Sequence, residues 1–196
     1  MRPARISRAQ VLDATLDLAA EAGLAAVTMR AVAARLEVTP MALYRHVGDK
    51  QGLLDGLVER LMAQIADAAD ATTDGAAPGH DADPDDDWRA TLRALATSIR
   101  AVARRYPDLF PLLFQRRAVT EGAQAPRQSV YAALRGAGVP ESELPAAERM
   151  LSTFVYGFAA SEAGGRFAGL DIESEFDYAA QHVERLIEAI AADGRR

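Results

Sequence analysis

Apolar residues recur every three or four positions along most of the chain, and no stretch alternates regularly between apolar and polar residues. Spacing of this kind is typical of amphipathic helices, so we predict an all-α protein with about nine helices. Alanine and leucine, both good helix formers, dominate these segments. The predicted helices span residues 8–22, 29–35, 40–46, 50–70, 87–105, 108–116, 126–137, 145–163 and 174–192.

The first three predicted helices begin with similar signals. Ser7, Thr28 and Thr39 stand at N-cap positions, each between two apolar residues that can form a hydrophobic staple. Ser7 is followed three residues later by Gln10, which completes a capping box. Only residues 36–38 separate the second helix from the third. Such a short turn predicts a helix-turn-helix unit.

The third predicted helix exposes small residues and hydrogen-bond donors, and no acidic residue lies on it. A helix that enters the major groove of DNA needs such a face, because carboxylates would lie close to phosphates. Tyr44 has an alternative interpretation as a half-buried aromatic packed on Leu36, but its helical phase favours the surface. The exposed positions are predicted to be Pro40, Met41, Ala42, Tyr44, Arg45 and His46.

The segment 28–50, with the helix before it and Leu53 and Leu54 after it, resembles the DNA-binding head of the TetR family of bacterial transcriptional regulators. The resemblance covers about residues 5–60 and extends over about a dozen positions, far more than one short motif. It implies an N-terminal three-helix head joined by a long helix to a larger helical ligand-binding and dimerisation domain. We therefore expect a helix-turn-helix domain over residues 1–50 and the larger domain over residues 51–196.

Carried over position by position, the resemblance implies a set of contacts with double-stranded DNA. It places Thr28 and Arg30 at phosphates or bases, Thr39 as a cap that also touches phosphate, Pro40, Met41 and Ala42 at base edges, Tyr44 and His46 on the sugar-phosphate backbone, and Lys50 at another phosphate. Taken singly, Arg30, His46 and Lys50 could instead be ordinary surface residues. Glu37 departs from the family pattern, which usually has glycine there. If this position requires a positive φ, glutamate destabilises the turn by about 1 kcal/mol.

The composition changes sharply over residues 71–86, which contain Gly, Pro and Asp and almost no bulky apolar side chain. Such a segment cannot bury enough surface to offset the entropy of ordering it, so we predict a mobile acidic loop. The alternative interpretation is an acidic segment that binds another protein.

Bulky side chains of the larger domain either surround a ligand pocket or form an ordinary core, and the resemblance favours the pocket. This set consists of Phe110, Phe114, Tyr131, Met150, Phe154 and Phe158. Glu162 and Arg166 are spaced as an i, i+4 pair. They would select the polar end of a ligand if either turned inward, and otherwise form a surface pair.

Small residues on one face of the helix 145–163 would allow another helix to approach closely. In the TetR family the last two helices of each subunit form a four-helix interface, although packing within one chain is the alternative. The predicted interface residues are Gly157, Ala160, Ser161, Gly164, Val183, Leu186 and Ile190.

Composition and charge exclude several other classes of protein. Among 196 residues there is no Cys, and the three His lie far apart, so we expect no disulfide, no metal site and no Cys nucleophile. No glycine-rich phosphate loop is present, and we expect neither a cofactor nor an enzymatic activity. The formal net charge is −6. Residues 1–50 hold 7 basic and 5 acidic side chains, so this part is mildly basic, as in a nucleic-acid-binding head.

The sequence also bears on location and regulation. No apolar run approaches the roughly 20 residues that span a bilayer, and no apolar signal segment follows the N-terminus, so we expect a cytoplasmic protein. The helix-turn-helix head, the possible pocket and the resemblance to the TetR family together predict a homodimeric repressor that binds a palindromic operator and is released by a hydrophobic small molecule. The alternative is a constitutive or activating DNA binder without a ligand pocket. A third possibility is a protein-interaction module that uses the acidic loop.

Overall fold

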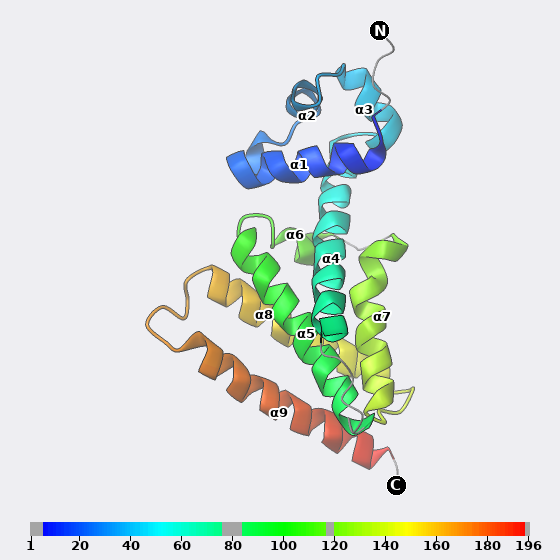
Figure 1. Ribbon diagram of the computed structural model, residues 1–196, viewed down its shortest axis with the longest axis vertical. Helices are drawn as coiled ribbons and strands as arrows, with labels where there is room; N and C mark the ends of the chain where they lie inside the picture. The colour runs from blue at the N-terminus through cyan, green and yellow to red at the C-terminus, as the bar shows by residue number, and fades with distance from the viewer. Residues whose placement is uncertain (1–5, 76–83, 117–119, 195–196) are drawn as a thin grey trace. The chain divides into compact units, whose positions relative to one another are not determined.

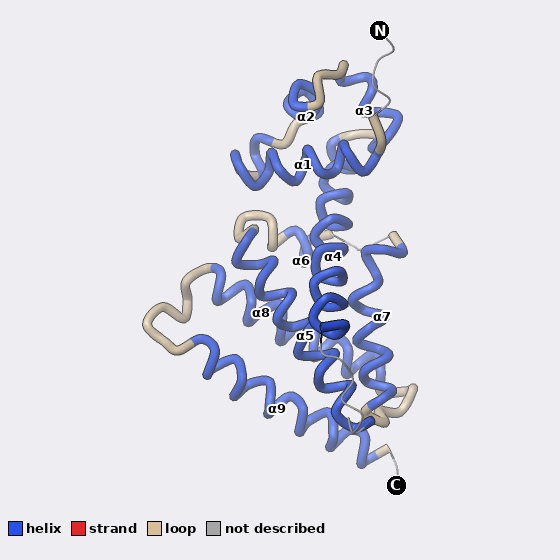
Figure 2. Tube along the Cα trace, viewed as in Figure 1, coloured by secondary structure: helices blue, strands red, loops and turns tan. Residues whose placement is uncertain are grey.

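The computed structural model describes residues 6–75, 84–116 and 120–194. Within these ranges every regular element is helical and there are nine α-helices. Figures 1 and 2 show how these helices are arranged, with no strand among the described residues. The all-α fold predicted from the sequence is therefore confirmed. The helices are α1 (Arg8–Ala22), α2 (Met29–Arg35), α3 (Pro40–Val47), α4 (Lys50–Gly75), α5 (Pro84–Arg105), α6 (Leu112–Gln115), α7 (Glu121–Gly136), α8 (Leu144–Ala163) and α9 (Ile172–Asp193), with a short 3₁₀ helix, η1, at Leu24–Ala26.

The chain forms two compact units, and the division falls inside α4. The first unit consists of residues 1–63 and 106–123, and the second of residues 64–105 and 124–196. No helix in the described parts of the chain is both long and apolar enough to cross a membrane.

The ends of several helices differ from the predicted ones. α4 extends to Gly75 and α5 already begins at Pro84, so the ends of the predicted 71–86 loop are helical, while residues 76–83 lie outside the described residues. Near the end of α4 the Thr72 hydroxyl donates to the Ala68 carbonyl at 2.9 Å. Proline is common at a first helical position because its fixed φ suits it.

The predicted helix 108–116 is wrong over most of its length. Only the four residues of α6 are helical, and tight turns precede it, in which the Phe110 N–H donates to the Tyr106 carbonyl at 2.9 Å. Pro111 has no N–H and stands at the N-cap, so it cannot continue a helical ladder from these turns. α7 begins at Glu121, earlier than expected, and contains Pro126.

The three helices of the head pack as the sequence predicted. Val11, Val32 and Leu43, one from each of α1, α2 and α3, are fully buried, and Figure 1 shows α2 and α3 running in different directions against α1. The capping box of α1 is present, because Ser7 accepts from the Gln10 N–H and donates its own N–H to the Gln10 side chain. Glu37, in the turn, has φ +54°, so the glycine-like conformation suspected from the sequence is real.

Helix α4 is fitted tightly to the head. A Cβ at Gly52 would overlap the Val47 carbonyl, and one at Gly56 would overlap the side chain of Leu12. The Asp49 carboxylate caps α4 by accepting from the Gly52 N–H at 2.9 Å. These close approaches fix the direction in which α4 leaves α3.

In the second unit α5 and α8 form the most extensive helix pair, and α9 also packs on α8. The core contains the only tryptophan, Trp88, together with Leu134, Leu144 and Ile187. Helices α5, α7, α8 and α9 all contribute to this core, which holds the cavity described below.

Candidate DNA-binding surface and ligand cavity

Helix α3 presents an outward face that is available to a partner. Leu43 is fully buried, and the helical period therefore turns Met41 and Tyr44 outward, where they are 73% and 47% exposed. Arg45 is exposed as well. The surface position that helical phase predicts for Tyr44 is confirmed.

The remaining predicted DNA-contacting residues lie around this face. Thr28, Arg30, Thr39, Pro40 and Lys50 are exposed, whereas Ala42 and His46 are half-buried. The Thr28 hydroxyl accepts from the Ala31 N–H at 3.1 Å and caps α2. The Thr39 hydroxyl, in contrast, makes no capping bond, although Thr39 occupies the N-cap of α3.

Charge on the head is divided between two groups of side chains. Arg35, Arg8 and Arg60 form ion pairs with Glu21, Glu59 and Asp13, which join the helices of the first unit. The hydrogen bonds from Arg35 lower the pKa of Glu21. Arg30, Arg45 and Lys50 have no ion-pair partner among residues 6–75, 84–116 and 120–194. The second group can therefore meet an external anion without first breaking an internal pair.

The structure separates the residues that were predicted to line one ligand pocket. Phe110 is buried and Phe114 is 55% exposed, and their rings contact edge to face within the first unit. Tyr131, Met150, Phe154 and Phe158 belong to the second unit, where all four are half-buried. Of the eight residues predicted to bind a ligand, none lines a comparatively polar hollow of the second unit between Trp88 and Ser129, and Phe154 alone lines an apolar cavity of the same unit.

That cavity lies between α5, α7, α8 and α9, has a volume of about 70 Å³ and is partly open to solvent. Most of its walls are aliphatic rather than aromatic, so the aromatic residues in the sequence do not mark it. Small residues on two different helices, Ala96 and Ala180, leave the space. The lining consists of Leu92, Arg93, Leu95, Ala96, Ile99, Val130, Leu151, Ser152, Phe154, Val155, Phe176, Ala180, Val183, Glu184 and Ile187.

Glu162 does not pair with Arg166, so the predicted i, i+4 pair is wrong. Helix α8 ends at Ala163, and Gly165 has φ +74°, so Arg166 lies beyond the helix and is exposed. Glu162 instead accepts from Arg100 at 2.7 Å and from Arg104 at 2.9 Å.

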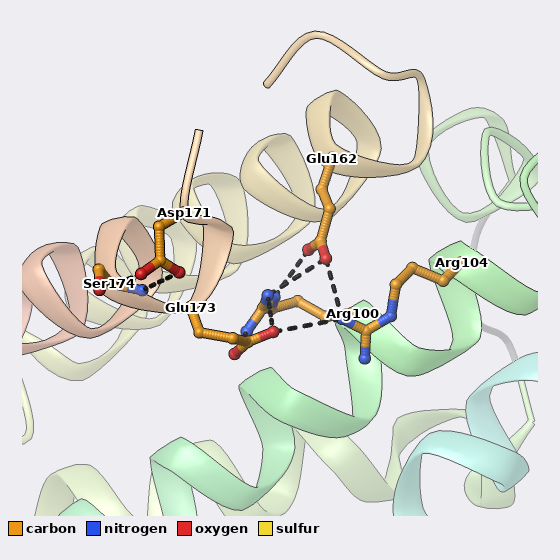
Figure 3. Close-up of polar contacts among 6 residues, drawn as sticks. All are labelled: Arg100, Arg104, Glu162, Asp171, Glu173 and Ser174. Carbon is orange, nitrogen blue, oxygen red and sulfur yellow. Dashed lines mark hydrogen bonds and ion pairs between the residues drawn. The ribbon is translucent and has the colours of Figure 1, made fainter. Parts of the chain in front are cut away.

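Arg100 is the centre of an ion cluster that the sequence did not indicate, in which the Arg100 and Glu162 side chains are buried and those of Arg104 and Glu173 are exposed. Figure 3 shows its guanidinium between Glu162 at the end of α8 and Glu173 at the start of α9. The Arg100 side chain is only 2% exposed, and it also lies 4.2 Å from the centre of the Phe176 ring. Burial alone would raise the pKa of Glu162, but hydrogen bonds from Arg100 and Arg104 outweigh it and lower the pKa.

The predicted dimer residues are partly accessible on α8 and α9. Gly157 and Gly164 are exposed, and Leu186 is 45% exposed. Ala160 and Ser161 are half-buried. Val183 and Ile190 are used within the chain, because Val183 lines the cavity and both side chains pack against the core of the second unit.

Comparisons with known proteins agree with this architecture. Residues 11–57 match the model described as "Bacterial regulatory proteins, tetR family", and residues 80–192 match "Tetracyclin repressor-like, C-terminal domain". A curated relative, the HTH-type transcriptional repressor DrrR1 of Streptomyces coeruleorubidus, is 31% identical over 153 residues, which is 78% of this chain and 52% of DrrR1. The chain thus spans about half the length of that relative.

Solved structures show the same fold at low sequence identity. ActR from Streptomyces coelicolor matches with a TM-score of 0.78 and 18% identity over 97% of this chain and 99% of ActR. BioQ from Mycobacterium smegmatis matches with a TM-score of 0.70 and 23% identity over 94% of this chain and 99% of BioQ. The chain also matches a structure of BioQ with its double-stranded DNA operator and a structure of ActR with actinorhodin. Because one family model matches the head and another matches more than half of the chain, the protein belongs to the TetR family of bacterial transcriptional regulators.

Proposed function

We propose that the protein is a transcriptional repressor that binds a palindromic operator as a homodimer and leaves it when a small molecule binds. The observation that carries this proposal is the outward face of α3, which combines exposed Met41, Tyr44 and Arg45 with cations that lack an internal partner in the described parts of the chain. DrrR1 is named a repressor, and BioQ has been solved with its operator, which supports the same activity for this chain.

On this account the head divides its contacts between bases and phosphates. Pro40, Met41 and Ala42 lie at the start of α3 and would meet base edges in the major groove. The phosphate contacts would come from Thr28, Arg30, Thr39, Tyr44, His46 and Lys50, and Arg45 joins them because it is exposed and unpaired in the described parts. Phosphate contacts hold the head in position, whereas base contacts supply sequence preference.

The proposed dimer uses α8 and α9. Gly157 on α8 and Gly164 at its C-cap are exposed and add no bulk, so another helix could approach there. Tyr178 and Leu186, two helical turns apart on α9, are 65% and 45% exposed. Large exposed apolar side chains of this kind mark interaction surfaces. A single head reads few base pairs, and pairing two heads on two half-sites multiplies the specificity.

Helix α4 offers a path from a ligand to the DNA. Its residues 50–63 belong to the first compact unit and residues 64–75 to the second, so one continuous helix is shared by both. We infer that a ligand bound in the second unit acts on α3 through this helix. ActR has been solved with actinorhodin, a small molecule, which supports a ligand-responsive body. The alternative, a constitutive or activating DNA binder, requires that no small molecule changes DNA binding.

A gel shift with the DNA upstream of the protein's own gene tests the proposal. We expect a specific complex that forms with the wild type and is strongly weakened by Tyr44→Phe together with Lys50→Ala. Arg135→Gln serves as the control, because Arg135 lies on α7 and pairs with Glu141 on the surface of the second unit. Binding that is absent, or equally unaffected by all these changes, would refute the DNA-binding role.

A further inference from the structure

The cavity of the second unit has one polar group whose bonding is incomplete. Ser152 lines the cavity, and its hydroxyl donates to Glu148 Oε1 at 2.9 Å. A hydroxyl has one hydrogen and two lone pairs, so Ser152 retains only acceptor capacity. No residue in the described ranges donates to this oxygen.

The other polar groups of the lining are already satisfied by one another. Arg93 donates to both oxygens of Glu184, at 2.6 and 3.1 Å. Glu184 is 13% exposed, and removing its partner would leave a largely desolvated charge. A ligand therefore gains little by competing for this pair, and Ser152 remains the polar contact that it can use.

The charge beside Ser152 restricts the ligand further. Glu148 is 7% exposed, and its second oxygen lies 3.3 Å from Arg127. A ligand atom bonded to the Ser152 oxygen would lie within about 6 Å of this carboxylate, given ordinary hydrogen-bond lengths. A like charge at that distance is unfavourable in a partly buried site. The Ser152 end of the cavity therefore disfavours an anion. Because Arg127 already balances the charge of Glu148, a cation finds no unpaired negative charge there, and a neutral donor fits best.

We propose that this cavity binds a small, neutral, largely apolar molecule whose single hydroxyl or N–H group donates to Ser152. The remaining walls are aliphatic and aromatic, with Val155, Ala180 and Phe176 among them, and they fit an apolar ring or branched chain. Its volume of about 70 Å³ is smaller than the roughly 150 Å³ that encloses a benzene ring, so one ring is the upper limit and it would protrude through the open side of the cavity. The role of this ligand as an effector rests on the proposed function, but its binding does not.

Three single-ring probes that differ in one group test the chemistry on the full-length protein by isothermal titration calorimetry. p-Cresol carries a neutral donor, 4-methylanisole has the oxygen without the hydrogen, and p-toluate is an anion. A phenol stays neutral at pH 7, because phenolic pKa values are about 10. We expect p-cresol to bind about five- to tenfold more tightly than 4-methylanisole, as one hydrogen bond allows, and p-toluate to bind most weakly.

Ser152→Ala isolates the proposed hydrogen bond. The affinity of this variant for p-cresol should fall to its affinity for 4-methylanisole, which should be the same as in the wild type. Ser129→Ala is the matched control, because Ser129 lies on α7, bonds the Ala125 carbonyl and does not line the cavity. Ala180→Leu, which fills the cavity, should abolish binding of both neutral probes; if it does not fold, Ser152→Ala still decides the outcome.

The proposal is overturned if p-cresol does not bind, if p-toluate binds most tightly, or if the preference for p-cresol survives Ser152→Ala. A gel shift on the same samples keeps this result separate from the repressor proposal. Operator binding without p-cresol binding refutes only the ligand assignment. Binding of p-cresol by a protein that ignores DNA refutes only the repressor role.

Discussion

Arginines of the two compact units, on α2 and α3 of the head and on α5 of the second unit, are used in opposite ways. On the head, Arg30 and Arg45 are exposed and have no ion-pair partner in the described parts of the chain. In the second unit Arg100 is 2% exposed and is held by two glutamates, as Figure 3 shows. Among the described residues, arginine thus stays without an internal partner where we expect an external anion, and it is paired with glutamates where it joins three helices.

The difference follows from the cost of burying charge. A guanidinium removed from water must be paired inside the protein, and Glu162 and Glu173 supply that pairing for Arg100. An exposed guanidinium stays hydrated and needs no internal partner until a phosphate replaces the water. Within the head itself, paired Arg35 is structural, whereas Arg45, unpaired among the described residues, is available. Within the head, pairing therefore separates structural Arg35 from available Arg45. The position on α3 must be added to this criterion, because Arg149, Arg166 and Arg185 of the second unit are also exposed without an ion pair in the described parts of the chain.

The largest effect should come from Arg100→Met. The substitution leaves Glu162, whose side chain is 8% exposed, with only Arg104 as a partner, so unfolding should become easier by about 3–5 kcal/mol, as for other broken buried pairs. Urea denaturation measures this change. The control is Arg135→Met, which breaks a pair with Glu141 that is fully exposed to solvent and should therefore change the stability hardly at all. Equal losses in both variants would contradict the contrast between buried and exposed arginines.

The head should separate base contacts from phosphate contacts. Changing Met41 should alter the preferred base pairs, at about 1–3 kcal/mol for each disrupted base contact. Lys50→Ala should weaken all sequences alike and reduce the salt slope of binding by about one unit per subunit. Fluorescence anisotropy over a salt series gives both quantities. If Lys50→Ala has the same salt slope as the wild type, Lys50 does not contact a phosphate.

Glu37→Gly should stabilise the protein by up to about 1 kcal/mol, because glutamate is strained at φ +54° and glycine is not. Part of the gain is offset by the greater freedom of glycine in the unfolded chain. Glu37→Ala keeps the strain and should remain close to the wild type in urea denaturation. If alanine stabilises as much as glycine, backbone strain is not the cause.

The smallest effect should be a pH dependence of the Arg100 cluster. The pKa of Glu162 is lowered in the folded protein, so its contribution to stability is present above its ordinary pKa of 4.5 and is lost as pH falls through the lowered value. The stability difference between the wild type and Glu162→Gln should therefore shrink in acid. If the stability difference between the two proteins grows in acid, the pKa of Glu162 is raised in the folded protein and not lowered. Denaturation at several pH values measures it.

Local signals made the head predictable from sequence. Each cap, staple and turn involves residues only a few positions apart in the chain, so α1, α2 and α3 and the outward position of Tyr44 follow from local sequence. The strained turn at Glu37 could be suspected for the same reason. All of these features need only short-range geometry.

The cavity and the Arg100 cluster depend on packing between distant segments and could not be predicted in this way. Arg100 and Glu162 are far apart in the sequence, and no local pattern distinguishes buried Arg100 from exposed Arg105. The aromatic residues that suggested a pocket divide between two units, and small side chains such as Ala96 and Ala180 define the actual space. Helical periodicity identifies a buried face but not what it meets.

Whether the protein reads DNA with α3 as a homodimer is best decided by selecting bound sequences from a random double-stranded DNA library, because the selection itself identifies the operator sequence. The account predicts that the wild type enriches a palindrome with two half-sites one helical turn, or a multiple of it, apart, which is about 10 base pairs for each turn. A protein with Met41 changed should enrich an altered palindrome. Enrichment of no sequence, or of a single unpaired half-site, would contradict the account of a homodimer reading DNA with α3.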